Sequence, residues 1–386
     1  MNTRLSAWNY IRNNKKTAGV LIVALALSFM AIYAIYVLLA TTIESFEPVM
    51  VEMPKKVTYA SLTDETIGVT REDYETGEEY SLAWRDRKDE IVEKLKEHKG
   101  IENAYFTEII YAKYEAVLGG WNYETPLLEA EEIPQFLEHT GAKLIEGRMP
   151  EGDGEILVDK IVMKNQNMQV GDWFREDVFG ESFKICGVIE SDIMVCVGTP
   201  ITGTNSGWCY VILSDEDTSD AKKLFSDIGI QITDEDSVFD AVYCKEQYDN
   251  DTKNMIESVV NILYLVVMIF LAISVFVAYI SFMRNRVNEY CLYSSIGYSR
   301  QNIYGMIMRE MMIIFGIGII AGALLSLSAA YLIHNLIIEP KGLVGHIIYS
   351  DRMFGILAAY VFIMGLLQLP VLLNIHDIKT IDAIED

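Results

Sequence analysis

Uncharged apolar runs divide the chain into a membrane part and a polar part. Residues 18–40 contain no Asp, Glu, Lys or Arg, and the runs at 258–283, 311–338 and 353–375 are likewise free of formal charge. At about 1.5 Å per helical residue, each run is long enough to cross a hydrocarbon core of about 30 Å. Only a helix satisfies its own backbone within a single span. The pattern therefore predicts four transmembrane α-helices.

The first run has an alternative interpretation as a cleaved signal peptide, because Arg12, Lys15 and Lys16 precede it. Its 23 residues exceed the usual apolar region of a signal peptide, which is about 7–15 residues. The length favours an uncleaved anchor.

Basic residues near the ends of the runs predict the orientation. They are concentrated before the first run and between the second and third, as Arg4, Arg12, Lys15, Lys16, Arg284, Arg286, Arg300 and Arg309. Short cytoplasmic segments carry such an excess of Lys and Arg. We expect segment 1–17, loop 284–310 and tail 376–386 to be cytoplasmic, and residues 44–257 to lie on the opposite side.

Charge is divided unevenly between these parts. Residues 44–257 hold 47 acidic and 20 basic residues, a net charge of −27, and the rest of the chain holds 11 basic and 8 acidic residues. This acidity argues against nucleic acid or an anionic membrane surface as a partner of that domain. A solvated acidic face and a cation-binding role both remain open, and the first is favoured.

The segment 44–257 alternates helical and strand patterns, which predicts an α+β extracytoplasmic domain inserted between helices 1 and 2. Residues 86–99 read as a helix, and 247–257 as a helical stalk that leads into the second apolar run. Strands are expected within 101–117, 155–158, 183–189 and 208–213, with turns at Gly119-Gly120 and at 170–172.

Four cysteines fall in this domain: Cys186, Cys196, Cys209 and Cys244. They allow up to two disulfides with three possible pairings, and their spacing does not choose among them. Free buried thiols are an equal alternative.

Motifs for catalysis or nucleotide binding are missing from the sequence. It has no GxxxxGK[ST], no HExxH and no GxSxG. The acidic runs 215–217 and 234–236 lack the spacing of an EF-hand and are better explained as solvated loops. The apolar runs lack the carboxylates typical of ion-driven transport. We expect no enzyme activity and no catalytic, cofactor or metal residue on this chain, so that energy comes from another subunit.

The loop 284–310 has a near-helical pattern of polar and apolar residues. Gly297 is placed to end one helix, and Ser299 to cap a second helix that continues into the third apolar run. In that run, Gly316, Gly318 and Gly322 favour close packing of helices, within the bundle or in a dimer.

These residues resemble the FtsX-like permeases. The family's loop pattern corresponds to Arg286, Glu289, Ile296-Gly297 and Glu310, and the order of one helix, an outer domain and three helices is similar to the MacB type. Ser294 departs from the pattern, since many members carry Arg or Lys there. Further pieces in the family's order are residues 146–150, the strand at Glu155, 170–172, 186–188 and the tail 377–386.

The resemblance implies a multi-pass protein of the bacterial cell (plasma) membrane that works with a separate ABC ATPase, which binds ATP and Mg. It also implies that Arg286 and Glu289 face the ATPase, that Gly297 permits the turn, and that Glu310 anchors the third helix. Ile296 and Arg300 belong to the same ATPase-coupling set. Plain positive-inside topology is the alternative for the arginines, and an interfacial snorkelling charge is the alternative for Glu310.

Two functions follow from the resemblance. The first is a permease subunit that couples ATP hydrolysis in the ATPase to movements of the extracytoplasmic domain, for export or extraction of a peptide or lipid-linked substrate. The alternative is a mechanotransmitting scaffold that activates an extracytoplasmic partner, such as a cell-wall hydrolase, without transport. The expected partners are the ATPase, a second permease copy or paralogue, membrane lipid and an extracytoplasmic protein. A sensor that works without an ATPase is a third, disfavoured possibility.

Overall fold

The protein is described by a computed structural model that covers residues 8, 11–12, 15–175, 182–201, 207–284, 287–351 and 353–362. The chain divides into two compact units. The helical unit comprises Met1–Leu38, Ser258–Asn335 and His346–Asp386, and the head unit comprises Leu39–Glu257 and Leu336–Gly345.

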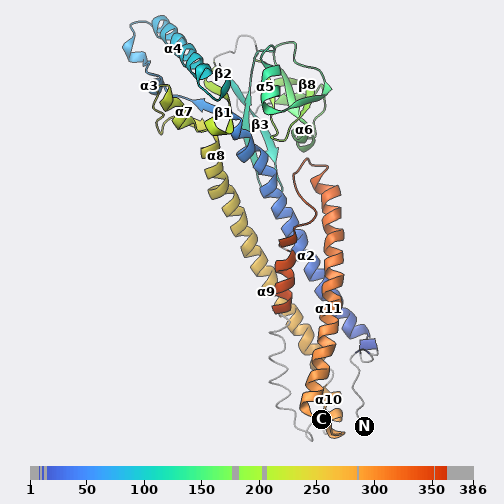
Figure 1. Ribbon diagram of the computed structural model, residues 1–386. Helices are drawn as coiled ribbons and strands as arrows, with labels where there is room; N and C mark the ends of the chain where they lie inside the picture. The colour runs from blue at the N-terminus through green and yellow to red at the C-terminus, as the bar shows by residue number, and fades with distance from the viewer. Residues whose placement is uncertain are drawn as a thin grey trace. The chain divides into compact units, whose positions relative to one another are not determined.

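Long helices form the helical unit (Figure 1). They are α2 (Lys15–Glu47), α9 (Asn254–Arg284), α10 (Val287–Ser295) and α11 (Arg300–Ile333), which runs on into the π-helical turn η6 (His334–Ile338). Two stretches of the described chain are long and apolar enough to cross a membrane, Ala18–Lys55 and Gln301–Ile338, and they contain the first and third predicted spans.

The second and fourth predicted spans are not among the two stretches that are long and apolar enough to cross a membrane. The second falls within α9, which confirms its helical conformation. Only Met353–Phe362 of the fourth is described, as a shorter apolar helix, and residues 363–375 lie outside the described chain. Four membrane crossings therefore remain a prediction.

Two of the three glycines singled out in the third run lie where α11 packs against α2. A Cβ atom on Gly322 would lie 2.8 Å from the Cβ of Phe29, and one on Gly318 would lie 3.0 Å from the Cβ of Leu25. Nothing lies within 4 Å of the corresponding position on Gly316. Gly318 and Gly322 are four residues apart, so they present one face of α11, and the lack of side chains lets the backbones approach.

Aromatic side chains connect α2 with residues 347–349 and with the last described helix, Met353–Phe362. The hydroxyl of Tyr33 donates to the carbonyl of Ile347 (3.1 Å) and accepts from the amide of Tyr349 (3.0 Å). The rings of Phe29 and Tyr360 have centroids 5.3 Å apart. Aromatic pairs with this separation add to the stability of a packed interface.

The outer faces of these helices carry apolar side chains. Those with more than half of their surface exposed include Val20, Val23, Ile262, Leu265, Ile269, Ile320, Leu324, Leu336 and Phe354. Such extended apolar surface is not stable against water and marks contact with lipid or another protein.

A four-stranded antiparallel sheet forms one lobe of the head unit, in the order β11-β1-β10-β2. Its strands are β1 (Val57–Ser61), β2 (Ile101–Thr107), β10 (Cys209–Ser214) and β11 (Ser237–Phe239), and the helices beside it are α3 (Asp64–Ile67), α4 (Gly77–Glu97) and α7 (Ala221–Asp227). Figure 1 shows these helices gathered at one lobe. Ile91 and Leu95 of α4 pack on Ala104, Tyr210 and Ile212 of the sheet in one buried core.

The helix expected at residues 86–99 is longer at its N-terminus than predicted. α4 begins at Gly77, after a capping box in which Thr76 accepts from the amide of Glu79 and the Glu79 carboxylate accepts from the amide of Thr76. This reciprocal cap satisfies two orphan donors of the first turn. The helix ends at Glu97, before the predicted residue 99.

The second lobe holds a five-stranded sheet, a hairpin and two helices. The sheet has the order β5-β8-β6-β9, with β7 also paired to β8. Strands β6 and β8 are parallel, and the connection between them includes α6. The bounds are β3 (Ile109–Glu115), β4 (Gly120–Pro126), α5 (Ile133–Thr140), β5 (Lys143–Gly147), β6 (Glu155–Asp159), α6 (Lys160–Gln166), β7 (Trp173–Arg175), β8 (Ser182–Glu190) and β9 (Val197–Gly198).

Short helical turns complete the head unit, and they link it to the long helices. They are η1 (Pro48–Glu52), η2 (Met53–Lys55), η3 (Arg71–Asp73), η4 (Glu216–Thr218), α8 (Ala241–Gln247) and η5 (Tyr248–Lys253). α8, η5 and α9 follow one another without a loop, which confirms the helical conformation expected for residues 247–257.

The strands and turns expected in 101–117, 155–158, 170–172, 183–189 and 208–213 are confirmed within one or two residues. The predicted α+β class of the domain is therefore observed. The four cysteines of the domain are buried free thiols and form no disulfide: Cys186, Cys196, Cys209 and Cys244.

Candidate functional site

Helices α10 and α11 form a helical hairpin in the predicted coupling loop, and its turn has a defined geometry. The amide of Gly297 donates to the carbonyl of Ser294, and the amide of Tyr298 donates to the carbonyl of Tyr293, each at 3.1 Å. These two bonds define a Schellman motif, which satisfies carbonyls at a helix end. The Tyr293 and Tyr298 rings, with centroids 5.9 Å apart, supply its hydrophobic contact.

Gly297 is required by this turn because its φ is +97°, a conformation that L side chains rarely adopt. Two residues later, the Ser299 hydroxyl accepts from the amide of Asn302 and caps α11. The predicted helix end at Gly297 and the predicted N-cap at Ser299 are both confirmed.

The hairpin is held together by buried side chains. Tyr290 and Cys291 of α10 are buried, as are Ile303, Met306 and Ile307 of α11, and the two helices contact each other. The hairpin is therefore held by the hydrogen bonds of its turn and by buried side chains of both helices.

The tip of the hairpin exposes two apolar side chains. Leu292 is 58% exposed and Ile296 is 66% exposed. Ile296 directly follows α10, and its amide donates to the carbonyl of Leu292 (3.1 Å), so the two residues are one helical turn apart. An exposed apolar pair next to a rigid turn is typical of a protein-binding surface. Ile296 was selected from the sequence, whereas Leu292 was missed, although its i, i+4 spacing to Ile296 was a usable signal.

The other predicted coupling residues have different surroundings. Arg286 lies outside the described residues, and Arg300 is the first residue of α11. Glu289 is half-buried on α10. Glu310 is fully buried in the first half of α11, so a charge that snorkels toward water does not describe it. A buried carboxylate is stable only with polar or charged partners, which suits an anchoring role.

A second element of interest is the segment 336–345, which we call the strap. It follows α11 in the chain and is part of the head unit. The Asn165 side-chain amide donates to the carbonyls of Glu115 (2.7 Å) and Lys341 (3.0 Å), and its oxygen accepts from the amide of Glu115 (2.8 Å). One side chain thereby joins α6, β3 and the strap.

The rest of the strap is held at close range. The Tyr114 hydroxyl donates to the carbonyl of Gly342 (2.8 Å). Gly342 has a φ of +59°, and a Cβ there would collide with the carbonyl of Ile161. The Ser45 hydroxyl donates to the carbonyl of Val344 (3.2 Å) and accepts from its amide (3.0 Å). Sequence reasoning missed the strap; Pro340, Gly342 and Gly345 were the only signal of a specific turn there.

The sequence pieces that resembled the MacB-type domain meet at one corner of the second lobe. The Arg148 guanidinium pairs with the Glu155 carboxylate, which also accepts from the amides of Glu151 and Gly152. The hydrogen bond from Arg148 lowers the pKa of Glu155 to about 2. A Cβ on Gly187 would lie 2.7 Å from the carbonyl of Arg148.

The turn at 170–172 is hydrogen-bonded to β8, the strand that also contains Gly187. The amide of Gly171 donates to the carbonyl of Ile185 (2.8 Å), and the amide of Ile185 donates to the carbonyl of Asp172 (3.0 Å). The motif residues therefore build the lobe, and their geometry gives them a structural role.

His, Cys, Asp and Glu side chains are dispersed in the part of the chain that the structure describes. No group of three His, Cys, Asp or Glu side chains there could hold a metal ion. Burial raises the pKa of Glu124 to about 7 and that of Asp159 to about 6. Asp159 is occupied as the cap of α6, where it accepts from the amide of Ile161. These two carboxyls are buried core groups.

Long helices with apolar outer faces define a membrane protein, and the chain carries a folded domain between two of them. Residues 261–381 match the model of the family described as FtsX-like permease C-terminal. The C-terminal region of the chain is therefore similar to the FtsX-like permeases, and this match confirms the resemblance of the loop.

Two solved structures are similar to part of the chain. The periplasmic region of MacB from Actinobacillus actinomycetemcomitans has 13% identity over 54% of this chain and 98% of its own length, with a TM-score of 0.28. The extracellular domain of the noncanonic ABC-type transporter YknZ from Gram-positive bacteria has 12% identity over 47% of this chain and 98% of its own, with a TM-score of 0.26. Similarity at this level does not define an activity. No curated protein matches the chain.

Proposed function

We propose that this chain is the permease subunit of an ABC-type transporter and that it couples ATP hydrolysis in a separate ATPase to movements of its head unit. The single observation that carries the proposal is the hairpin of α10 and α11, with its fixed turn and its exposed Leu292 and Ile296. This tip supplies an apolar anchor for the ATPase, and Arg286, Glu289 and Arg300 supply the surrounding charge.

The path from this tip to the head unit is continuous in the chain. α11 runs without interruption from Arg300 to Ile333 and is followed by η6 and the strap, which is hydrogen-bonded to Asn165 and Tyr114. In this proposal a displacement of the hairpin is transmitted along α11 to the strap, and from there to β3 and α6. Glu310 anchors α11 near its start.

The remaining parts of the proposal follow from this role. Both termini and the hairpin are cytoplasmic, the head unit is outside the bacterial cell membrane, and the chain crosses the membrane four times. ATP and Mg bind to the ATPase. The permease pairs with a second copy or a paralogue, because an ABC machine uses two ATPase sites and one hairpin offers a dock for one. The cargo is a peptide or a lipid-linked molecule.

The test is the ATPase rate in lipid nanodiscs of the complex formed with the separate ABC ATPase. Leu292→Asp plus Ile296→Asp places two charges on the apolar tip, so we expect loss of the ATPase from the purified complex or at least about a tenfold fall in its rate. The matched control is Leu82→Asp plus Leu118→Asp, which changes two exposed leucines of the head unit. Unchanged assembly and rate in the tip variant would overturn the proposal.

The alternative function, activation of an extracytoplasmic partner without transport, uses the same hairpin and strap. It is favoured by one observation, an open groove on the head unit that has the features of a protein-binding edge. The two functions separate in one measurement. Stimulation of the ATPase by a small cargo supports transport, and stimulation only by a folded extracytoplasmic protein supports the scaffold.

A further inference from the structure

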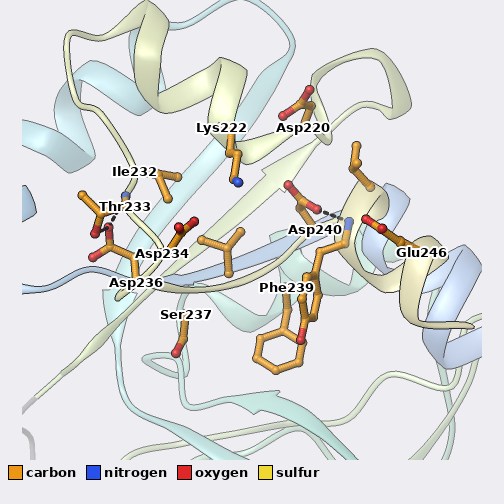
Figure 2. A pocket seen from close by; sticks show the side chains of 13 residues that line it. Asp220, Lys222, Ile232, Thr233, Asp234, Asp236, Ser237, Phe239, Asp240 and Glu246 are labelled. Carbon is orange, nitrogen blue, oxygen red and sulfur yellow. Dashed lines mark hydrogen bonds between the residues drawn. The ribbon is translucent and has the colours of Figure 1, made fainter. Parts of the chain in front are cut away.

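A groove of about 420 Å³ in the head unit is lined by all three residues of β11 (Figure 2). Its walls come from the start of α7, the turn at 232–236, β11 itself and the first two turns of α8. Its volume lies within the usual range of ligand sites, about 300–1,000 Å³. The groove is far too acidic for an ordinary apolar ligand pocket, so its chemistry needs a separate account.

β11 is an edge strand. It pairs with β1 through Tyr59↔Phe239, Ala60↔Val238 and Ser61↔Ser237, and within the described residues no strand pairs with its other side. Such an edge leaves backbone N–H and C=O groups open to another strand. Proteins use this property to bind extended segments by strand addition, in which main-chain hydrogen bonds give affinity and side chains give specificity.

The charges around the groove are almost all negative. Five acidic side chains line it, against one Lys222. Figure 2 shows Asp220 and Glu246 at one end and Asp234 at the other. Asp236 is held as an anion: burial alone would raise its pKa, but the amides of Thr63 and Thr233 donate to its carboxylate and lower it overall.

Apolar side chains stand between these charges. Val242 is 56% exposed and Tyr243 is 44% exposed, both on the first turn of α8. The Tyr243 ring contacts Phe239 of β11 with centroids 5.6 Å apart. A partner segment would therefore meet backbone groups, carboxylates and an aromatic surface along one line.

The acidic side chains of the groove argue against a metal ion and against a second copy of this domain as its ligand. They are spread along the groove and do not converge on one point, in agreement with the lack of a metal-holding cluster in the described chain. A second copy of this domain would bring another net charge of −27 to an acidic edge, which like-charge repulsion opposes.

We propose that this groove binds an extended, lysine- or arginine-bearing segment of a different protein, which adds a strand to the free edge of β11 and places its cations on Asp220, Asp234 and Glu246. An apolar side chain of the segment rests on Val242 and Tyr243. The groove is thus a docking surface for a basic partner on the head unit.

The position of the groove gives docking a consequence. Its α8 wall begins at Ala241, and α8 is followed directly by η5 and α9 in the chain. A bound segment therefore contacts the first turns of the helix that leads into the second apolar run. This inference adds a binding surface to the alternative function as a scaffold. It depends on the proposed function in one respect, the location of the head unit outside the cell membrane.

The test measures binding by the full chain in phosphatidylcholine nanodiscs, whose lipid has no net charge, with no ATPase present. The probe is a fluorescent peptide in which Lys alternates with Val and Tyr. A second peptide carries Glu in place of Lys, and a third is N-methylated at alternate amides, which blocks strand pairing but keeps the charge. We expect binding of the first peptide alone and at least about a tenfold loss on N-methylation.

Charge variants complete the design. Asp234→Asn plus Glu246→Gln should weaken binding of the Lys peptide about fivefold at low salt and less at high salt. Glu97→Gln plus Glu131→Gln, on exposed positions of other elements, should leave it unchanged. Equal binding of the N-methylated peptide, or equal weakening by both pairs of substitutions, would overturn the proposal. Because no ATPase takes part, failure here leaves the result of the ATPase test intact.

Discussion

Glu124 illustrates how a single residue in the head unit makes stability depend on pH. Burial raises the pKa of its carboxyl from 4.5 to about 7, an effect that its own backbone amide only partly offsets. The folded state therefore keeps a proton that the unfolded state has lost between these pH values. The free energy of unfolding falls as pH rises through that window, by about 3 kcal/mol at about 1.36 kcal/mol per pH unit.

Glu124→Gln removes this loss, because an amide has no proton to release. We expect the variant and the wild type to unfold at the same temperature near pH 4.5, and the variant to become more stable as pH rises to 8. The measurement is thermal unfolding of the full chain in detergent across this range. Glu97→Gln, at an exposed position, is the control and should follow the wild type.

Asn165 is the residue that most directly fixes the strap. Asn165→Ala removes three hydrogen bonds to the backbone of Glu115 and Lys341, each worth about 0.5–1.5 kcal/mol. We expect trypsin to cleave after Lys341 at least about fivefold faster in the variant. Asn122→Ala, at an exposed position of β4, is the matched control. Equal cleavage rates in the two variants would show that the strap does not depend on this side chain.

At the scale of elements, the close contact of α11 with α2 depends on glycines in α11, which have no side chain. Gly322→Ala places a Cβ 2.8 Å from Phe29 and 3.3 Å from the Cα of Ala26, so the helices must separate. Overpacking of this kind costs about 1–3 kcal/mol. We expect a lower unfolding temperature of the full chain in detergent.

Gly316→Ala supplies the control for this prediction. The same methyl is added to the same helix, but nothing lies within 4 Å of it. Replacing glycine by alanine in a helix is favourable by about 1 kcal/mol. The control should thus be neutral or more stable, and a stability loss equal to that of Gly322→Ala would contradict the packing account.

Elements with a local signal were predictable, and those fixed by distant contacts were not. The Schellman turn at Gly297 and the cap at Ser299 follow from residues next to them in the chain. α4 is an exception: it was placed nine residues short although Tyr80, Ala83 and Trp84 in its first turns have helical spacing and pack against the core. The strap has no pattern of its own, since its conformation comes from Tyr114, Asn165 and Ser45, far away in sequence.

At the scale of the whole molecule, the proposed function makes the hairpin and the strap the two ends of one coupling path. If the ATPase drives this path, ATP and Mg should change the rate of tryptic cleavage at Lys341 in the complex by at least about twofold, since local opening reports on mechanical state. Leu292→Asp plus Ile296→Asp should abolish the nucleotide effect and leave the basal cleavage rate unchanged. A nucleotide response that survives in that variant would place the dock elsewhere.

The turn in the candidate site was predictable from the sequence, and its exposed residues were less so. The loop 284–310 was identified from its arginines and glycine, and Gly297 has the predicted conformation. The i, i+4 spacing of Leu292 to Ile296 was a usable signal for this exposed pair, but the burial of Tyr290 and Cys291 beside it is seen only in the structure. The groove beside β11 arises where four separate segments meet, so no single stretch of sequence indicates it.

The strap also makes the head unit discontinuous along the chain. A fragment excised as residues 44–257 would lack the ten residues of the strap, so the side chains of Asn165 and Tyr114 would lose the carbonyls that accept their hydrogen bonds there. Fragment complementation should restore these bonds: a synthetic decapeptide with the sequence of residues 336–345 would rebind there.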